Sequence, residues 1–234
     1  MHLAKVRVAP EGLDPTVLQR LMQGDAYGNH QLLWQLFPGQ SDRPFLFRQE
    51  LERESRVEGQ PRGLPLFYVL ATVEPDPVPG LLDCQCKPFT PQLHTGQHLA
   101  FKLRANPVVA RKEEGRARSR RHDVLMDAKK AARDGGEGDP AAIQARMDDA
   151  AREWLGDAER AQQHGYRLLA EPFVSGYRQH AYRRKGGEIR FSSVDFEGSL
   201  EVTDPERFRG TLAEGIGRSK AFGCGLWLVR RLPS

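Results

Sequence analysis

The sequence predicts an α+β fold made of two similar halves, expected at residues 1–92 and 96–234. Three observations support this prediction. The first half has the element order β-α-β-β-α-β, which is the ferredoxin-like order. A comparable mixture of strands and helices restarts near residue 96 and completes a second α+β unit. The length of 234 residues and the 39% content of hydrophobic residues suffice for two small cores.

The first half opens with a strand and a helix. Residues 3–8 alternate between apolar and polar, as in a half-buried strand. Asp25 is placed to cap a helix through Phe37, with Leu33, Trp34 and Phe37 on one face and Pro38-Gly39 as the stop. The other expected elements are a helix at 15–22, strands at 44–51 and 65–73, a short helical turn at 76–82 and a closing strand at 84–89.

The second half starts with a strand at 97–106 that Pro107 ends. Pro140 suits the first turn of a long helix reaching about residue 164, in which apolar residues recur at helical spacing. The remaining expected elements are strands at 166–170, 173–184, 188–196 and 200–202, a helix at 204–213, a glycine-rich loop and a terminal strand at 226–232.

Charge is unevenly distributed along the chain. The net charge is only +4, but residues 111–133 hold nine Lys or Arg against four Asp or Glu. This density indicates either a polyanionic partner or a solvated, partly disordered loop, which continues into the glycine run at 135–138. The sequence has no apolar run long enough to cross a membrane and no signal-peptide pattern at its start, and its three cysteines fit a reducing cytoplasm.

The glycine-rich loop near the C-terminus is the most informative segment. Gly215 and Gly217 precede Arg218, Ser219 and Lys220, and exposed amides beside two cations suit a phosphate group. The spacing matches neither a Walker loop nor a dinucleotide-binding fingerprint. The alternative is an ordinary helix end followed by a tight turn.

Six motifs in the same order resemble the CasE family, the repeat-cleaving endoribonucleases of type I-E CRISPR systems. They are residues 3–6 (Leu-Ala-Lys-Val), 27–38 (Tyr-Gly-Asn-His-Gln-Leu-Leu-Trp-Gln-Leu-Phe-Pro), 45–48 (Phe-Leu-Phe-Arg), 101–107 (Phe-Lys-Leu-Arg-Ala-Asn-Pro), 194–198 (Val-Asp-Phe-Glu-Gly) and 215–226 (Gly-Ile-Gly-Arg-Ser-Lys-Ala-Phe-Gly-Cys-Gly-Leu). The resemblance implies two tandem ferredoxin-like (RRM-like) domains. It implies metal-free cleavage of CRISPR precursor RNA below a repeat stem-loop, with no cofactor, and retention of the mature crRNA among the other subunits of the surveillance complex.

The resemblance assigns the catalytic histidine to His30 and its partner to Tyr27. Metal-free RNA cleavage uses the ribose 2′-OH as nucleophile, and histidine suits the proton transfers because its ordinary pKa is near neutrality. The spacing of three residues puts both side chains on one helix face. His30 is expected to act as base or acid, and Tyr27 to orient the 2′-OH. Some relatives carry cationic or hydroxyl side chains further along this helix, where this sequence has Gln31 and Gln35, so Lys220 or Arg218 is expected to stabilise the transition state.

RNA binding is expected at several basic sites. Residues 185–187 form an expected hairpin turn after Arg183 and Arg184. The resemblance assigns Arg183, Arg184 and Lys185 to gripping the stem. The Gly215, Gly217, Arg218, Ser219 and Lys220 loop and Arg104 are further expected contacts. Arg111, Lys112, Arg116, Arg118, Arg120 and Arg121 are expected to contact phosphates nonspecifically or to lie in a solvated loop.

Two cysteines and two histidines imitate a zinc motif. Cys84 and Cys86 precede His94 and His98, but C-x-C is an unusual ligand spacing and His98 falls in an expected strand, so no metal is predicted. Two rival functions remain open: a noncatalytic RNA stem-loop-binding subunit, and a phosphometabolite-binding protein that uses the glycine loop.

Overall fold

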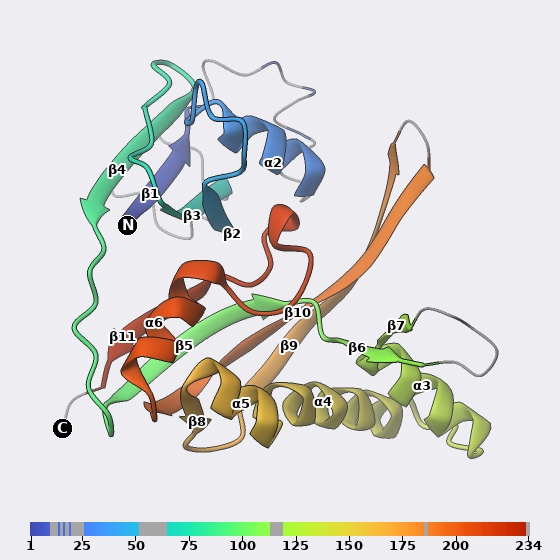
Figure 1. Cartoon of the computed structure of the whole chain (residues 1–234). Coiled ribbons are helices and arrows are strands. Elements are labelled where there is room, and N and C mark those ends of the chain that lie inside the picture. The colour runs from blue at the N-terminus through green and yellow to red at the C-terminus, as the bar shows by residue number, and fades with distance from the viewer. Residues whose placement is uncertain are drawn as a thin grey trace, which may run out of the picture. The chain divides into compact units, whose positions relative to one another are not determined.

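The computed structural model describes residues 1–9, 14, 16, 19, 26–51, 65–112, 119–184 and 187–232, and of residues 51, 183 and 184 it describes the backbone alone. The chain divides into two compact units (Figure 1). Unit 1 comprises Met1–Pro91 and Lys220–Leu226, and unit 2 comprises Gln92–Ser219 and Trp227–Ser234. The domain ranges 1–92 and 96–234 stay a prediction. The two units differ from these ranges in one respect, since the segment Lys220–Leu226 belongs to unit 1.

Unit 1 contains a four-stranded antiparallel sheet and helix α2. Its elements are β1 (His2–Val8), α2 (Ala26–Trp34), β2 (Phe45–Leu51), β3 (Pro65–Ala71) and β4 (Leu82–Pro88). The strand order β2-β3-β1-β4 is that of a ferredoxin-like sheet. The helix expected at 15–22 and the capping Asp25 lie largely or wholly outside the described residues.

Helix α2 and one sheet face enclose the core of unit 1. Leu33 and Leu36 bring the apolar stripe of the helix region against Val6 and Phe67, all of which are fully buried. Each such side chain removed from water stabilises the fold by about 1.5–3 kcal/mol.

The helical turn expected at 76–82 does not form. The segment instead makes an isolated bridge between Val78 and Leu82 and packs Val78 and Leu81 against the core. Pro77 and Pro79 explain the difference, because each proline lacks an N–H group and restricts the residue before it. This covering segment stands where the second helix of the ferredoxin-like order would lie.

Unit 2 contains a five-stranded antiparallel sheet. Its strands are β5 (His98–Ala105), β8 (Tyr166–Leu168), β9 (Phe173–Arg184), β10 (Gly187–Val202) and β11 (Trp227–Arg231). The order β11-β5-β10-β8 is again ferredoxin-like, with β9 paired to β10. The predicted α+β fold of two tandem ferredoxin-like domains is confirmed. In Figure 1, β9 and β10 form a long ribbon that extends beyond the rest of this sheet.

Three helices contribute buried side chains to unit 2: α4 (Pro140–Gly156), α5 (Ala158–His164) and α6 (Pro205–Glu214). The single helix expected from residue 140 to 164 is broken at Asp157. This residue ends α4 and caps α5, because its Oδ1 accepts a hydrogen bond from Arg160 N. Phe101, Tyr166 and Phe208 surround Trp227 at ring-centroid distances of 5.0, 5.4 and 6.0 Å.

The basic stretch at 111–133 is more ordered than the sequence indicated. Strand β6 (Val108–Arg111) pairs with β7 (Arg120–Asp123), and α3 (Val124–Asp134) follows and packs on α4. Asp123 caps α3 by accepting hydrogen bonds from Leu125 N and Met126 N, and Leu125 and Ala132 are buried about two helical turns apart. The loop interpretation was therefore wrong for residues 120–133, while Arg116 and Arg118 lie outside the described residues.

Candidate functional site

The two residues expected to perform chemistry lie on α2. Tyr27 keeps 43% of its surface exposed, and His30, three residues later, is half-buried. Neighbouring Asn29 is buried and donates a hydrogen bond from Nδ2 to Gln49 Oε1 at 2.7 Å, which ties the helix to β2. This hydrogen bond fixes the part of α2 that carries Tyr27 and His30 to the sheet of unit 1.

The ring of His30 is held by aromatic neighbours. Trp34 donates its indole N–H to His30 Nε2 at 3.0 Å, and the Phe45 ring lies 5.8 Å from the imidazole. Burial, and secondly the positive charge of Arg43, lower the pKa of His30 below its ordinary value. His30 is thus a neutral imidazole at neutral pH, as a proton acceptor must be.

The hydrogen-bonding state of His30 limits what it can do without movement. Because Nε2 accepts from Trp34, the ring proton belongs on Nδ1, and Nδ1 is buried with no partner among the described residues. Proton transfer with a ligand therefore requires a ring rotation that frees Nε2 or exposes Nδ1.

Part of the glycine-rich loop belongs to the same unit as His30. The short 3₁₀ helix η2 (Lys220–Phe222) packs against α2 and β2. A Cβ at Gly223 would lie 3.2 Å from Phe47 Cε2, so glycine permits the close approach of this segment to the core. The structure thus brings Lys220 to the helix that carries Tyr27 and His30.

The preceding part of the loop belongs to unit 2. Gly215 ends α6, and its N–H donates to Thr211 O at 2.8 Å, as an ordinary helix end requires. Gly217 and Ser219 have φ of 75° and 56°, and Asn106 Nδ2 donates to Ser219 Oγ at 2.8 Å. Arg218 is exposed. Phosphate binding by these residues stays a prediction.

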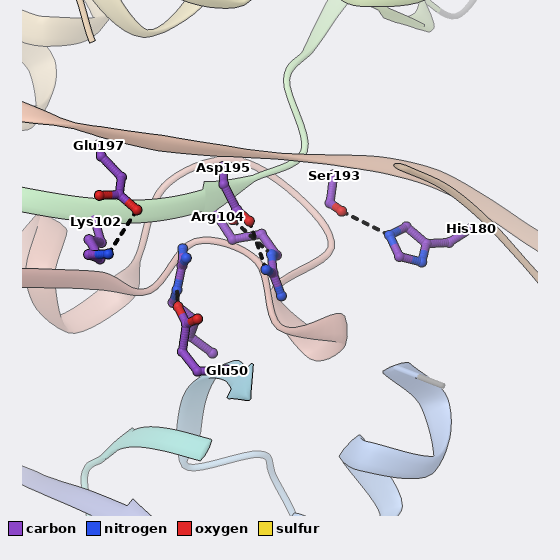
Figure 2. Close-up of polar contacts among 8 residues, drawn as sticks. Glu50, Lys102, Arg104, His180, Ser193, Asp195 and Glu197 are labelled. Carbon is purple, nitrogen blue, oxygen red and sulfur yellow. Dashed lines mark hydrogen bonds and ion pairs between the residues drawn. The ribbon is translucent and has the colours of Figure 1, made fainter. Parts of the chain in front are cut away.

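Arg104 is engaged in an ion pair that the sequence did not reveal. Figure 2 shows its guanidinium facing Asp195, with Nε and Nη2 donating to the two carboxylate oxygens at 2.9 and 2.8 Å. Lys102 and Glu197 make a parallel pair at 2.8 Å. Cross-strand register places these residues opposite each other, and that register is invisible in a local motif. To contact RNA, Arg104 would have to bind it alongside Asp195 or break its hydrogen bonds to Asp195.

The ribbon of β9 and β10 carries the expected stem-gripping residues. Arg183 pairs in register with Glu188 and Arg184 with Gly187, which confirms a hairpin, whereas Lys185 and the side chains of both arginines lie outside what the structure describes. Arg120 and Arg121 are exposed on β7. RNA contacts by these residues stay predictions.

Sequence reasoning missed an aromatic cluster in the same ribbon. His180 stacks on Phe191 with ring centroids 4.5 Å apart, and its Nε2 lies 2.8 Å from Ser193 Oγ (Figure 2). Tyr182 Oη lies 3.2 Å from His180 Nδ1. Burial, then the charges of Arg178 and Arg104, lower the pKa of His180 to about 4. The alternation of these residues along facing strands is the signal that could have found the cluster.

Two sheets in ferredoxin-like order, with a histidine-bearing helix after the first strand, define a tandem ferredoxin-like protein. Over residues 1–231 the chain matches the family model described as "CRISPR associated protein", and it belongs to that family. None of the helices in the described part of the chain is long and apolar enough to cross a membrane.

Two curated relatives lie within the family that the sequence indicated, and the CasE resemblance is confirmed. The chain is 30% identical over 208 residues to CRISPR-associated endoribonuclease Cse3 of Thermus thermophilus, covering 86% of this chain and 81% of the relative. It is 27% identical over 228 residues to the CRISPR system Cascade subunit CasE of Escherichia coli, covering 92% and 96%.

Solved structures agree with this assignment. Cse3 bound to 19 nt RNA matches with a TM-score of 0.67 and 29% identity, over 98% of this chain and all of that one. Cas6e from Escherichia coli matches with a TM-score of 0.63 and 25% identity, over 99% of this chain and all of that one.

Proposed function

We propose that this chain is a metal-independent endoribonuclease that cuts CRISPR precursor RNA at the base of the repeat stem-loop. It then retains the mature crRNA with the other subunits of a type I-E effector complex in the cytoplasm. Whole-chain similarity to a named endoribonuclease supports the activity, and so does the likeness to Thermus thermophilus Cse3 bound to an RNA representing a pre-cleavage complex, with a TM-score of 0.66 and 28% identity. A subunit of Cascade among the relatives supports the assembly.

The main support for the chemistry is the neutral, half-buried imidazole of His30. The helix that carries it also bears Tyr27 and packs against the short helix η2, which contains Lys220. In the reaction, the 2′-oxygen attacks the adjacent phosphorus while the bond from phosphorus to the 5′-oxygen breaks. The 2′-OH loses a proton and the leaving oxygen gains one, giving a 2′,3′-cyclic phosphate and a 5′-hydroxyl. His30 serves one of these transfers, Tyr27 donates a hydrogen bond to the reacting groups, and Lys220 offsets the charge at phosphorus.

RNA binding in this proposal uses the hairpin and the glycine loop. Arg183, Arg184 and Lys185 contact the stem, while Gly215, Gly217, Arg218 and Ser219 offer amides, a hydroxyl and a cation to a phosphate. Arg120 and Arg121 add nonspecific phosphate contacts. Arg104 also contacts a phosphate, and to do so it gives up one of its two hydrogen bonds to Asp195.

Cleavage of repeat RNA in EDTA tests the proposal. The wild-type protein should cut once below the stem, and His30→Ala should lower the rate about 100- to 10,000-fold, the usual contribution of a positioned acid or base, while binding persists. Tyr27→Phe should slow cleavage less. His94→Ala, which changes an exposed histidine, is the control and should cut normally.

A noncatalytic RNA-binding subunit is the second candidate, and the occupied Nε2 and buried Nδ1 of His30 favour it. Tight binding of intact RNA by the wild-type protein would support this candidate and overturn the enzyme. RNA affinity that does not respond to salt would instead favour a small phosphate-bearing ligand at the glycine loop.

A further inference from the structure

One group of metal-ligand side chains in unit 1 has no place in the proposed reaction. His2 on β1, Glu74 in the link between β3 and the covering segment, and Cys86 on β4 each offer one ligand atom, and these three atoms lie within 4.8 Å of one another. Cys86 Sγ lies 4.0 Å from His2 Nδ1. Among the residues that the structure describes, these three form the one group of His, Cys, Asp or Glu side chains with at least three donor atoms this close together.

The strand register and the missing helix create this arrangement. Cys86 lies opposite Ala4 and Pro88 opposite His2, so His2 and Cys86 are diagonal neighbours on the core face of an antiparallel pair. Glu74 follows β3, whose last residue Ala71 pairs with His2, and precedes the covering segment, so it lies at the same end of the sheet. His2 and Cys86 are partly buried and Glu74 is exposed, which leaves one side open to water.

We propose that His2, Glu74 and Cys86 bind a zinc ion, with water as the fourth ligand. Imidazole nitrogen, thiolate sulfur and carboxylate oxygen are the three donors that zinc takes in proteins, at about 2.0–2.3 Å. In a tetrahedral site such bonds put neighbouring donors about 3.3–3.6 Å apart. The 4.0 Å separation of His2 and Cys86 therefore needs only a small contraction.

The ion would tie the link that leads into the covering segment to strands β1 and β4. Val78 and Leu81 are only partly buried against the core, so this segment lacks the packing that a helix would supply. A metal bound by the folded state alone raises its stability in proportion to metal concentration. The role is structural and separate from the proposed cleavage, which continues in EDTA.

Cobalt titration of the full-length, tag-free protein tests the site. Co²⁺ takes the same ligands, and a Co²⁺–thiolate bond gives a charge-transfer band in the near ultraviolet. We expect one equivalent to bind with this band, and Zn²⁺ to displace it. Cys86→Ala should abolish the band, and His2→Ala should weaken binding at least about tenfold, since loss of an outer-shell partner alone costs that much.

Cys84→Ala is the matched control. Cys84 lies two residues away on the same strand, opposite Val6, and is outside the ligand group, so its removal should leave affinity and band unchanged. A melting temperature that rises with Zn²⁺ in the wild type and the Cys84→Ala variant, but not in Cys86→Ala, would agree. Absence of stoichiometric uptake, or equal uptake by Cys86→Ala, would overturn the zinc site while leaving the nuclease proposal untouched.

Discussion

His30 and Trp34 form a pair one helical turn apart in which the indole fixes the state of the imidazole. A neutral Nε2 can accept the Trp34 N–H and a protonated one cannot, so the bond favours the neutral ring. Arg43 acts in the same direction through its charge. Within α2, the indole therefore favours the neutral His30 ring and occupies its Nε2.

Trp34→Phe should therefore raise the pKa of His30, because the variant keeps an aromatic ring but loses the donated hydrogen bond. NMR titration of the histidine ring carbons measures this directly. A His30 pKa that stays or falls in the variant would show that the indole bond does not govern the ring.

Local spacing predicted some features of this site and could not predict others. Tyr27 and His30 were assignable to one helix face because helical periodicity is a property of the nearby sequence. The spacing of Trp34 from His30 was equally visible, but its meaning depended on the indole orientation. The pairing of Arg104 with Asp195 depends on register between strands 91 residues apart, which no motif contains.

At the scale of elements, the ribbon of β9 and β10 carries a cluster of stacked rings that includes the titratable His180. The pKa of His180 is about 4 in the folded protein, below its ordinary value of 6.5 in an unfolded chain. Both states are neutral above that ordinary value. As pH falls from 6.5 towards 4, the unfolded chain takes up a proton first, so folding stability is lost over this range.

His180→Gln should accordingly flatten the dependence of the unfolding free energy on pH between 6.5 and 4. Denaturant unfolding at a series of pH values gives the slope, which is compared rather than the absolute stability. His94→Gln provides the control, since it makes the same substitution at an exposed histidine outside this ribbon. Identical slopes in all three proteins would contradict a depressed His180 pKa.

The junction of α5, β8 and α6 depends on a glycine. Gly165 has φ of 73°, and a Cβ there would lie 2.5 Å from Asp204 O and 2.8 Å from Phe208 N. Gly165→Ala should cost more than the roughly 1–2 kcal/mol of a left-handed residue, because backbone atoms must also move. Gly39→Ala, with φ of 78° and no atom within 4 Å, should cost about that amount alone. Chemical denaturation compares the two variants, and equal costs would show that the junction relaxes freely.

Element prediction succeeded where one signal dominated and failed where two competed. β9 was predicted with the observed bounds because Pro172 precedes it and a glycine pair follows it closely, which marks both ends. The helical turn at 76–82 was overestimated because two prolines outweigh its remaining pattern. Helix α3 was missed because dense Lys and Arg suggested a solvated loop, although Leu125 and Ala132 kept a narrow apolar face and Asp123 supplied a cap.

At the scale of the whole molecule, the chain passes from unit 2 to unit 1 after Ser219 and returns after Leu226. Cys224 and Leu226 are buried in this short excursion. A linear division of the sequence could not reveal it, since a short apolar run after a glycine looks the same whichever core it enters. As a result, Lys220 packs with the helix of His30, while Ser219, which directly precedes it, and Arg218 belong to unit 2.

The charge of the whole chain makes a final prediction about RNA binding. With a net charge of +4, general attraction for a polyanion is weak, so salt-dependent affinity must come from local contacts. Replacing Arg183 and Arg184 together by alanine should weaken binding of a repeat stem-loop. It should also reduce the slope of log K against log salt by about 0.7–0.9 for each phosphate that the variant no longer neutralises, or roughly 1.4–1.8 in all.

A charge-matched variant separates local contacts from net charge. Arg146 and Arg209 are exposed on α4 and α6, and their joint replacement by alanine removes the same two charges away from the hairpin. Affinity measured at several salt concentrations should change little for this pair. An equal loss of slope in both variants would mean that net charge governs binding, and an unchanged slope in the Arg183 and Arg184 variant would move the RNA to another surface.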